Sequence, residues 1–342
     1  MTNTIEDIPR SYLAAILDMR GRATFSLNIP EAEDRSPTAE ANVRFSFGDN
    51  ASLAGLVDEF FKDIGVNHRT REDSSIRIEV RRNEDIQTIY EEIGSHSVEI
   101  ARALGYITNH QFTKEDIVKD AESVVEFTKT VQEIRPAKRE FDSLVYSPRE
   151  VAQRLGVSQI GIESHELPRM PDWDVLPKEY MGGVFDSIGG YHLQSTKDST
   201  FDLGYSLRPR ITLHRSSLHP VTVALVQDTL TESGVPHNVS TQSNIYTVQV
   251  EIHGENRIQK FHDAFGDEVF TSFPTLHAVS TEILPRFEDG LHKTKQGYYD
   301  ILYLAEYELG LFDRDIKYDT QYFAEKWGDE IDTYEVTTAD GI

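Results

Sequence analysis

The sequence contains no cysteine, which excludes disulfides, thiolate metal sites and a cysteine nucleophile. No apolar run approaches the roughly 18 residues of a membrane-spanning helix, and the first ten residues are polar and acidic, unlike a signal peptide. There is no P-loop or Gly-x-Gly-x-x-Gly run, and the 12 histidines form no His-Glu-x-x-His zinc pattern. We therefore expect a soluble, cytoplasmic protein without a nucleotide cofactor.

Basic residues are scarce, because 34 Lys and Arg are set against 58 Asp and Glu, giving a formal net charge of −24. Such an acidic balance is typical of proteins from a high-salt cytoplasm, so we expect a halophilic, haloarchaeal source. Taken alone, the charge argues against a nucleic-acid partner, since phosphate binding needs clustered Lys and Arg. An acidic background weakens that argument, and the positions of the few cations become informative.

An internal repeat occupies both halves of the 342-residue chain. One copy begins with the apolar segment Tyr12–Gly21 and the other with Tyr180–Gly189; each has small residues near its middle and an Asp three residues before its final Gly. Downstream, Leu56–His68 and Leu225–His237 are amphipathic helices that end at a glycine and share a Gly-Val-x-His exit. Two unrelated helices would not explain this second match.

The remaining elements of each copy follow from hydrophobic periodicity. The expected strands are 22–29, 42–47 and 75–81 in the first copy and 191–195, 205–214 and 244–252 in the second, with last helices at 84–93 and 256–265. Each copy reads helix, strand, strand, helix, strand, an optional further strand, helix. The predicted class is α+β, with αββαββα repeats whose helices cover one face of an antiparallel sheet.

The predicted organisation has four parts: a first repeat at 1–110, a helical connector at 111–177, a second repeat at 178–312 and an acidic C-terminal segment at 313–342. Within the connector, 147–158 is similar to the first helix and turn of a helix-turn-helix, with Pro148 in the first helical turn. The would-be recognition helix, 159–166, is short and contains Gly161. A plain connector helix is the preferred interpretation, and the helix-turn-helix stays open.

The two motif helices, LAAILDMRG and MGGVFDSIG, resemble the LAGLIDADG motif of homing endonucleases, in the two-repeat, single-chain form with degenerate motifs. The resemblance implies motif helices packed side by side on a pseudo-twofold axis and sheets that form a saddle over the DNA major groove. Ala14, Ala15, Gly182 and Gly183 would let the two helix backbones approach closely. It also implies double-stranded DNA as the partner and a monomer, because one chain supplies both halves of an internal pseudo-dimer.

Cutting by that family depends on the eighth motif position, where an acid binds the divalent metal that activates water. Here those positions hold Arg20 and Ile188, neither of which can bind Mg²⁺. The sixth-position acids, Asp18 and Asp186, are retained, and the resemblance gives them a structural role. We therefore expect no catalytic residue, no metal and no cofactor. The Arg20 guanidinium could hold a DNA phosphate or form a salt bridge with Asp18 or Glu31, and both interpretations stay open.

Polar residues of one parity on each strand are expected to face the DNA groove, while the others enter the core. Arg, Asn and Gln pair with base edges, and Arg also holds phosphates. The predicted DNA-facing residues are Arg22, Thr24, Ser26, Asn28, Arg44, Ser46, Arg77, Arg81, His192, Gln194, Arg208, Arg210, Thr212, His214, Thr247 and Gln249, and Glu79 and Glu251 share their parity. The alternative is that these residues simply face water.

The sequence thus predicts a sequence-selective, catalytically inactive double-stranded DNA-binding protein, acting as a transcription regulator or architectural factor at the nucleoid. One alternative is an active or residual Mg-dependent homing endonuclease in which Glu79, Asp49 or Glu251 binds the metal. Another is a protein-interaction scaffold whose working face is the acidic surface. Because the strand residues of the two copies differ, the expected DNA target is asymmetric.

Overall fold

The computed structural model describes residues 5–29, 37–109, 120–134, 147–216, 220–242, 247–311 and 317–334. Contacts between Cα atoms divide the chain into two compact units. The first unit comprises Met1–Ile188, His214–Thr229 and Thr241–Val248, and the second comprises Gly189–Leu213, Leu230–Ser240 and Gln249–Ile342. Within the described ranges, no helix is long and apolar enough to cross a membrane.

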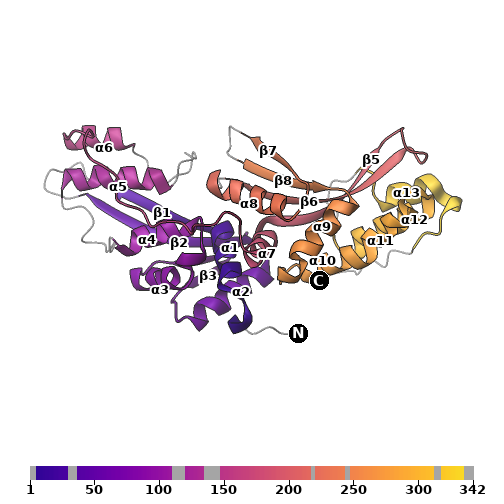
Figure 1. The fold of residues 1–342 in the computed structure, drawn as a ribbon, viewed down its shortest axis with the longest axis horizontal. Coiled ribbons are helices and arrows are strands. Elements are labelled where there is room, and N and C mark those ends of the chain that lie inside the picture. Colours follow the sequence, from indigo (N-terminus) through magenta and orange to yellow (C-terminus); the bar gives the residue numbers. More distant parts are fainter. Residues whose placement is uncertain are drawn as a thin grey trace. The chain divides into compact units, whose positions relative to one another are not determined.

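The first copy of the repeat has the predicted order of elements (Figure 1). These are α1 (Arg10–Arg20), β1 (Gly21–Asn28), β2 (Thr38–Gly48), α2 (Ala51–Asp63), β3 (Arg69–Glu72), β4 (Ile76–Val80) and α3 (Asn83–Ile93). The strands form an antiparallel sheet in the order β1-β2-β4-β3. Helices α1, α2 and α4 (Ile100–Asn109) pack on it. The additional strand, β3, precedes the alternating strand instead of following it.

The second copy repeats this order. Its elements are α7 (Lys178–Ile188), β5 (Gly189–Lys197), β6 (Tyr205–Ser216), α8 (Pro220–Glu232), β7 (Asn238–Gln242), β8 (Thr247–His253) and α9 (Glu255–Phe265). The sheet order is β5-β6-β8-β7, which is the order of the first sheet with each strand replaced by its counterpart. The predicted α+β class with two αββαββα repeats is therefore confirmed.

The Gly-Val-x-His turns after α2 and α8 have the same geometry in both copies. Each glycine has a positive φ, +74° at Gly65 and +67° at Gly234, a conformation that side chains with a Cβ rarely adopt. In each turn the histidine Nδ1, of His68 or His237, lies 3.0 Å from the backbone carbonyl oxygen two residues earlier. Both histidine rings therefore contact the backbone of their own turn.

The motif helices α1 and α7 pack directly against each other within the first unit. The small residues permit this approach, because a Cβ added at Gly183 would lie 2.5 Å from the Tyr12 carbonyl oxygen and 2.8 Å from the Ala15 Cβ. All residues from Tyr12 to Met19 are buried. The close packing expected from the small motif residues is confirmed at this crossing.

The motif acids bond reciprocally across the same helix pair. The Tyr12 hydroxyl donates to Asp186 Oδ2 at 2.5 Å, and the Tyr180 hydroxyl donates to Asp18 Oδ2 at 2.6 Å. Asp18 also accepts hydrogen bonds from Ser97 Oγ (2.6 Å) and from the backbone N–H groups of Val98 (2.8 Å) and Ile100 (2.8 Å). These buried contacts tie α1 both to α7 and to the start of α4.

The connector contains α5 (Ala121–Ile134) and α6 (Pro148–Leu155). Helix α6 begins at a Ser147 capping box and ends at Gly156, whose φ is +68°. The following segment, 157–177, contains no helix. A single connector helix is therefore present at 147–166, and a helix-turn-helix is not formed.

A group of helices follows α9 in the second unit. These are α10 (Phe273–Ala278), α11 (Leu284–Glu288), α12 (Lys295–Tyr303) and α13 (Thr320–Trp327), with π-helical turns at Val279–Ile283 and Leu304–Glu308. The rings of Phe323 and Trp327 on α13 lie 4.9 Å and 6.4 Å from the Tyr205 ring of β6. The C-terminal segment, anticipated only as acidic, thus contributes to the core of this unit.

Candidate nucleic-acid interface

One face of the first sheet is polar. Along β1, buried residues alternate with half-buried or exposed ones, as they do along most of β2. The polar positions are Arg22, Thr24, Ser26 and Asn28 on β1 and Arg44 and Ser46 on β2. On β4, Arg77 is half-buried, and Arg81 follows the strand as an exposed residue. The alternation in burial is therefore present along β1 and most of β2, whereas on β4 the polar Glu79 is buried together with Ile78 and Val80.

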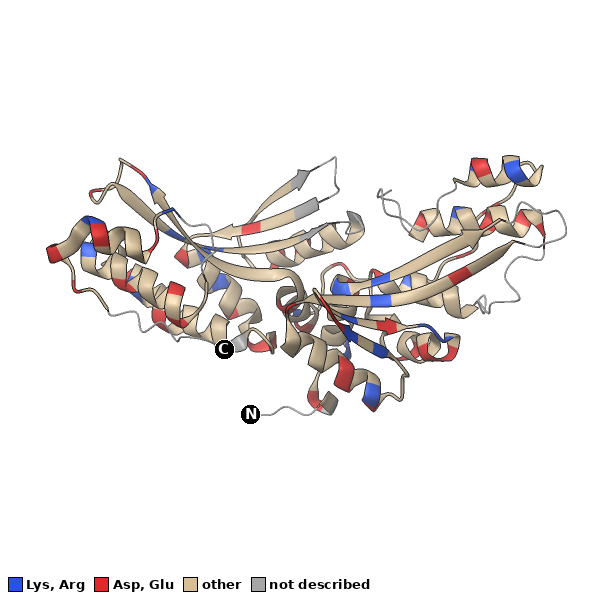
Figure 2. Cartoon of the chain, turned by 180° about the vertical axis from the view of Figure 1, so that it is seen from behind, with Lys and Arg blue, Asp and Glu red and all other residues tan. Residues whose placement is uncertain are grey.

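Arginines from all four strands become neighbours on this face, because residues paired across strands point to the same side of a sheet. The two cross-strand rows are Arg22–Arg44–Glu79–Arg69 and Ser46–Arg77–Arg71. Figure 2 shows the same concentration, with Lys and Arg positions recurring along the strands of the first sheet. The sheet therefore gathers cations that are well separated in the sequence.

Arg69 and Arg71 lie on the edge strand β3 and were not among the predicted DNA-facing residues. All four residues of this strand are exposed, so no apolar alternation identifies it. A signal is nevertheless present: Arg69 and Arg71 are two residues apart and precede Asp73, Ser74 and Ser75, a composition typical of a hairpin turn.

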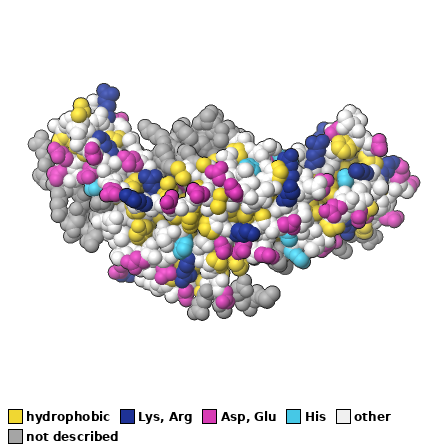
Figure 3. Space-filling model, in the orientation of Figure 1, with side chains coloured by type: hydrophobic (Ala, Val, Ile, Leu, Met, Phe, Trp, Pro, Cys, Tyr) yellow, Lys and Arg dark blue, Asp and Glu magenta, His cyan; other side chains and the backbone are white. Residues whose placement is uncertain are grey.

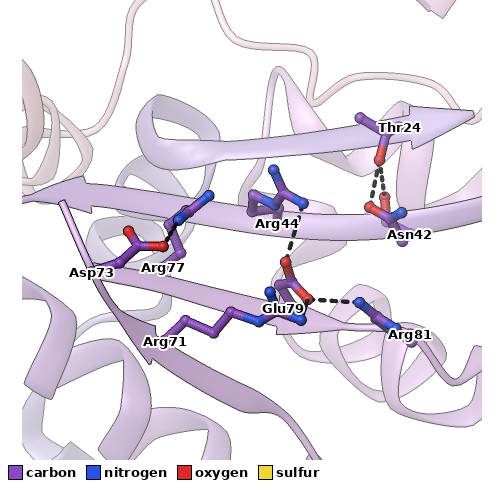
Figure 4. A network of polar contacts seen from close by, with 8 residues as sticks. All are labelled: Thr24, Asn42, Arg44, Arg71, Asp73, Arg77, Glu79 and Arg81. Carbon is purple, nitrogen blue, oxygen red and sulfur yellow. Dashed lines mark hydrogen bonds and ion pairs between the residues drawn. The ribbon is translucent and has the colours of Figure 1, made fainter. Parts of the chain in front are cut away.

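Glu79 lies among these arginines and is only 6% exposed, although it is on the polar face. Its Oε1 is 3.1 Å from Arg44 Nη2, and its Oε2 is 2.9 Å from Arg81 Nη2 and 3.8 Å from Arg71 Nη2 (Figure 4). Burial raises the pKa of Glu79, but the hydrogen bond from Arg81 and the charges of Arg71, Arg44 and Arg81 outweigh it, so the pKa lies below its ordinary value. Glu79 is thus an ionised acceptor shared by arginines of β2 and β3 and by the arginine that follows β4.

Other polar groups on this face are also paired. Arg77 forms an ion pair with Asp73 in the β3–β4 turn, and the Thr24 hydroxyl donates to the Asn42 side chain (Figure 4). The side chain of Asp73 is 54% exposed, so water screens its pairing with Arg77. Arg77 can therefore exchange this partner for another acceptor at low cost.

The second sheet has a polar face with fewer arginines. His192 and Gln194 on β5 lie opposite Arg210 and Arg208 on β6. Gln194 and Arg208 are exposed, whereas His192 and Arg210 are half-buried. Arg208 Nη2 lies 3.1 Å from Asp198 Oδ2. The sheet therefore offers a mixture of guanidinium, imidazole and amide groups.

Glu251 on β8 contacts three polar side chains of the second sheet. Its Oε1 is 3.5 Å from Arg210 Nη1 and accepts a hydrogen bond from Gln249 Nε2 at 2.9 Å. Its Oε2 lies 3.3 Å from His253 Nε2. As in the first sheet, one carboxylate contacts side chains that were predicted to read DNA.

Thr212, His214 and Thr247 are the remaining predicted residues of the second sheet. Thr212 is only 7% exposed; it lies opposite Gly190, and His192 Nε2 is 3.1 Å from where a Gly190 Cβ would stand. Thr212 is therefore buried and not an accessible part of the polar face. His214 is exposed near the end of β6. Thr247 begins β8, but its side chain lies outside the described residues.

The two motif positions at which the resemblance places metal ligands hold side chains that do not fit a divalent cation. Arg20 is itself a cation, and Ile188 has no ligand atom. Burial raises the pKa of Asp18 above its ordinary value, and the hydrogen bonds from Ile100, Ser97, Tyr180 and Val98 offset only part of this rise. Both Asp18 carboxylate oxygens accept hydrogen bonds from protein donors. Among the described residues, no group of three or more His, Asp and Glu side chains could hold a metal ion.

Arg20 is the last residue of α1 and is partly buried. Burial lowers the pKa of Arg20, and the charge of Asp49 raises it. Within the described part of the chain, the buried Arg20 Nε has no hydrogen-bond partner. The anticipated salt bridge to Asp18 is not formed, because the Asp18 oxygens bond to other donors. Glu31, the other anticipated partner, lies outside the described residues.

The chain is similar to known proteins in its fold but not in its sequence. No protein-family model matches the chain, and no curated protein matches it in sequence. The two tandem αββαββα repeats define a class of α+β proteins that is represented among solved structures.

The crystal structure of the I-LtrWI LAGLIDADG homing endonuclease bound to target DNA is similar, with a TM-score of 0.64 and 11% identity, covering 87% of this chain and 96% of that chain. The structure of the LAGLIDADG homing endonuclease I-GzeII in complex with its DNA target has a TM-score of 0.63 and 13% identity, and the match covers 87% of this chain and 97% of that chain. The structure of the LAGLIDADG homing endonuclease I-SmaMI bound to cleaved DNA has a TM-score of 0.64 and 12% identity, and the match covers 86% of this chain and 94% of that chain. The chain has the fold of the single-chain, two-domain LAGLIDADG homing endonucleases.

Proposed function

We propose that this protein binds double-stranded DNA sequence-selectively through the polar faces of its two sheets, and that it does not cut the DNA. The observation that carries the proposal is the group of arginines on one sheet face, in a chain whose formal net charge is −24. Guanidinium groups bind phosphates and guanine edges in the major groove. Solved proteins of the same fold were crystallised with DNA, which supports the same partner here.

The acidic surface sets the conditions for such binding. Asp and Glu side chains are spread widely over the face of the molecule seen in Figure 3. Their repulsion of DNA acts over about 10 Å at 0.1 M salt and over about 3 Å at 1 M. Direct contacts from sheet arginines act at shorter range, so we expect high salt to weaken the repulsion more than the contacts.

Catalytic inactivity is proposed because each candidate metal ligand is replaced or engaged. Arg20 and Ile188 stand at the metal positions of the motif. Glu79 and Glu251, which could have replaced them, have carboxylate oxygens directed to cationic or amide groups. Asp49 acts on Arg20 through its charge. A monomeric binder without cofactor would serve as a transcription regulator or an architectural factor.

The direct test compares Arg77→Ala with Arg257→Ala in duplex-DNA binding. Arg77 faces out from the sheet and has an exposed ion-pair partner, so its removal leaves no buried charge. Arg257 is exposed on α9 and serves as the matched control. We expect Arg77→Ala to weaken binding by about 1–3 kcal/mol, roughly 5- to 150-fold in Kd, and Arg257→Ala to leave it unchanged. Equal effects of the two changes would contradict the proposed surface.

A further inference from the structure

The same position in both sheets carries a carboxylate surrounded by donors. Glu79 is four residues before the first residue of α3, and Glu251 is four residues before the first residue of α9. Their strands, β4 and β8, occupy the same place in the two sheet orders. The partners of the two carboxylates differ. Arginines surround Glu79. Glu251 instead contacts Arg210, Gln249 and His253. The acid is thus shared by the two copies, whereas the side chains around it are not.

A carboxylate on a DNA-facing surface repels phosphate, so its presence at these two positions needs a compensating role. Direct reading of a cytosine amino group would require a free oxygen. Both oxygens of Glu79 already lie within 3.1 Å of guanidinium nitrogens of Arg44 and Arg81. The side chains of Arg44 and Arg81 nevertheless remain 41% and 64% exposed. The carboxylate therefore fixes one end of each guanidinium and leaves the remainder accessible.

We propose that Glu79 and Glu251 are positioning residues that convert charge attraction into sequence selectivity. Each holds the neighbouring groove-facing donors in a fixed orientation, and its charge opposes their binding to phosphates at unrelated sequences. Donors that are already fixed lose less side-chain entropy when they bind a matching base edge. A base edge whose acceptors do not match the fixed donors is rejected. This inference rests on the proposed DNA-binding function and assigns a role to two acids within it.

The test uses Glu79→Gln and Glu251→Gln in the full-length protein, with Glu91→Gln as the control. Gln keeps the shape of the side chain and one acceptor oxygen, but removes the charge. Glu91 is exposed on α3 and accepts a hydrogen bond from Gln87 at 2.7 Å, so its replacement gives the same charge change away from the sheet. Binding is measured to a random-sequence duplex and to the best duplex from a selection, over a series of salt concentrations. Circular dichroism shows whether each variant is folded.

We expect Glu79→Gln and Glu251→Gln each to bind the random duplex about tenfold more tightly, with a salt slope steeper by about one unit. The ratio of selected to random affinity should fall by about tenfold or more. A purely structural role would lower both affinities together and leave their ratio unchanged. That result, or equality of both variants with Glu91→Gln, would overturn the inference while leaving DNA binding intact. Absence of binding by the unsubstituted protein would instead overturn the proposed function, and the inference with it.

Discussion

At the scale of residues, each polar side chain on the first sheet is distinguished by the partner it already has. Glu79 binds Arg44 and Arg81 closely, whereas Arg77 pairs with an exposed acid. Arg20 has a buried Nε without a hydrogen-bond partner in the described ranges. Buried donors without an acceptor are uncommon in folded proteins, because the lost hydrogen bond to water is not replaced. These differences give separate predictions for Arg20 and Glu79.

For Arg20, we predict that Arg20→Ala lowers affinity for duplex DNA to a similar degree for all sequences and reduces the salt slope by about one unit. The physical reason is that a cation at the eighth motif position would contact a DNA phosphate, which carries no sequence information. Salt titration of binding measures both quantities, with Arg257→Ala as the control. Unchanged affinity would remove Arg20 from the binding surface.

The lowered pKa of Glu79 gives a prediction about acid stability. Burial raises this pKa, but the Arg81 hydrogen bond and the charges of Arg71, Arg44 and Arg81 bring it below the ordinary 4.5. The unfolded chain therefore binds this proton more readily than the folded one. The stability that ionised Glu79 contributes is fully present above pH 4.5 and is lost as pH falls through the folded pKa.

We consequently expect the free energy of unfolding to fall less steeply below pH 4.5 in Glu79→Gln than in the unsubstituted protein. Chemical denaturation at several pH values measures this difference. Glu91→Gln provides the control for removal of one carboxylate from α3, where it is exposed. If Glu79→Gln and the unsubstituted protein lose stability in parallel, the ion-pair group does not hold the charge of Glu79.

At the scale of elements, sequence periodicity identified those that bury an apolar stripe. The helices ending at Gly65 and Gly234 and the alternating strands β1 and β4 belong to this group. Strand β3 has four exposed residues, so its pairing with β4 depends on backbone hydrogen bonds that periodicity does not reveal. Helix α13 was missed for a different reason: Phe323 and Trp327 pack against Tyr205, more than a hundred residues away in the chain.

The crossing of α1 and α7 gives a prediction about packing. A methyl group at Gly183 would meet the Tyr12 backbone oxygen at 2.5 Å, and backbone atoms there cannot move aside without separating the helices. We expect Gly183→Ala to destabilise the protein by about 1–3 kcal/mol. Gly55, exposed on α2 with no atom within 4 Å of an added Cβ, is the matched control. Gly55→Ala should stabilise the protein by about 0.5–1 kcal/mol.

Thermal or chemical unfolding distinguishes these two glycine variants, because the expected changes have opposite signs. The same substitution, glycine to alanine in a helix, differs only in what surrounds the added methyl group. If Gly183→Ala were as stable as Gly55→Ala, the close approach of the motif helices would not exist in solution.

At the scale of the whole molecule, the repeat was predictable because each copy carries its own matching signals. The two motif segments and the two Gly-Val-x-His turns recur in the same order, and this order constrained the topology. The composition of the proposed DNA-facing surface was harder to predict from the sequence. Parity along a strand gives the face, but the neighbours of Glu79 depend on cross-strand register. Thr212 is likewise buried, which its parity along β6 does not reveal.

The difference between the two sheets has a consequence for the target. Arginines surround Glu79, whereas an amide, an imidazole and one guanidinium contact Glu251. Arginine favours guanine and phosphate, and Gln favours adenine. The two half-sites should therefore differ in sequence, and the half-site of the first sheet should supply more of the salt-dependent affinity.

The most direct measurement is selection of bound fragments from a random double-stranded DNA pool at high potassium chloride, with a parallel Mg²⁺ sample scored for strand breaks. Our account predicts an enriched, asymmetric motif of about twelve base pairs or more, in line with the extent of specific protein–DNA interfaces, with both strands intact. Absence of enrichment at every salt concentration would contradict DNA binding and favour a protein partner. Cleavage that depends on Mg²⁺ would contradict catalytic inactivity and restore the endonuclease.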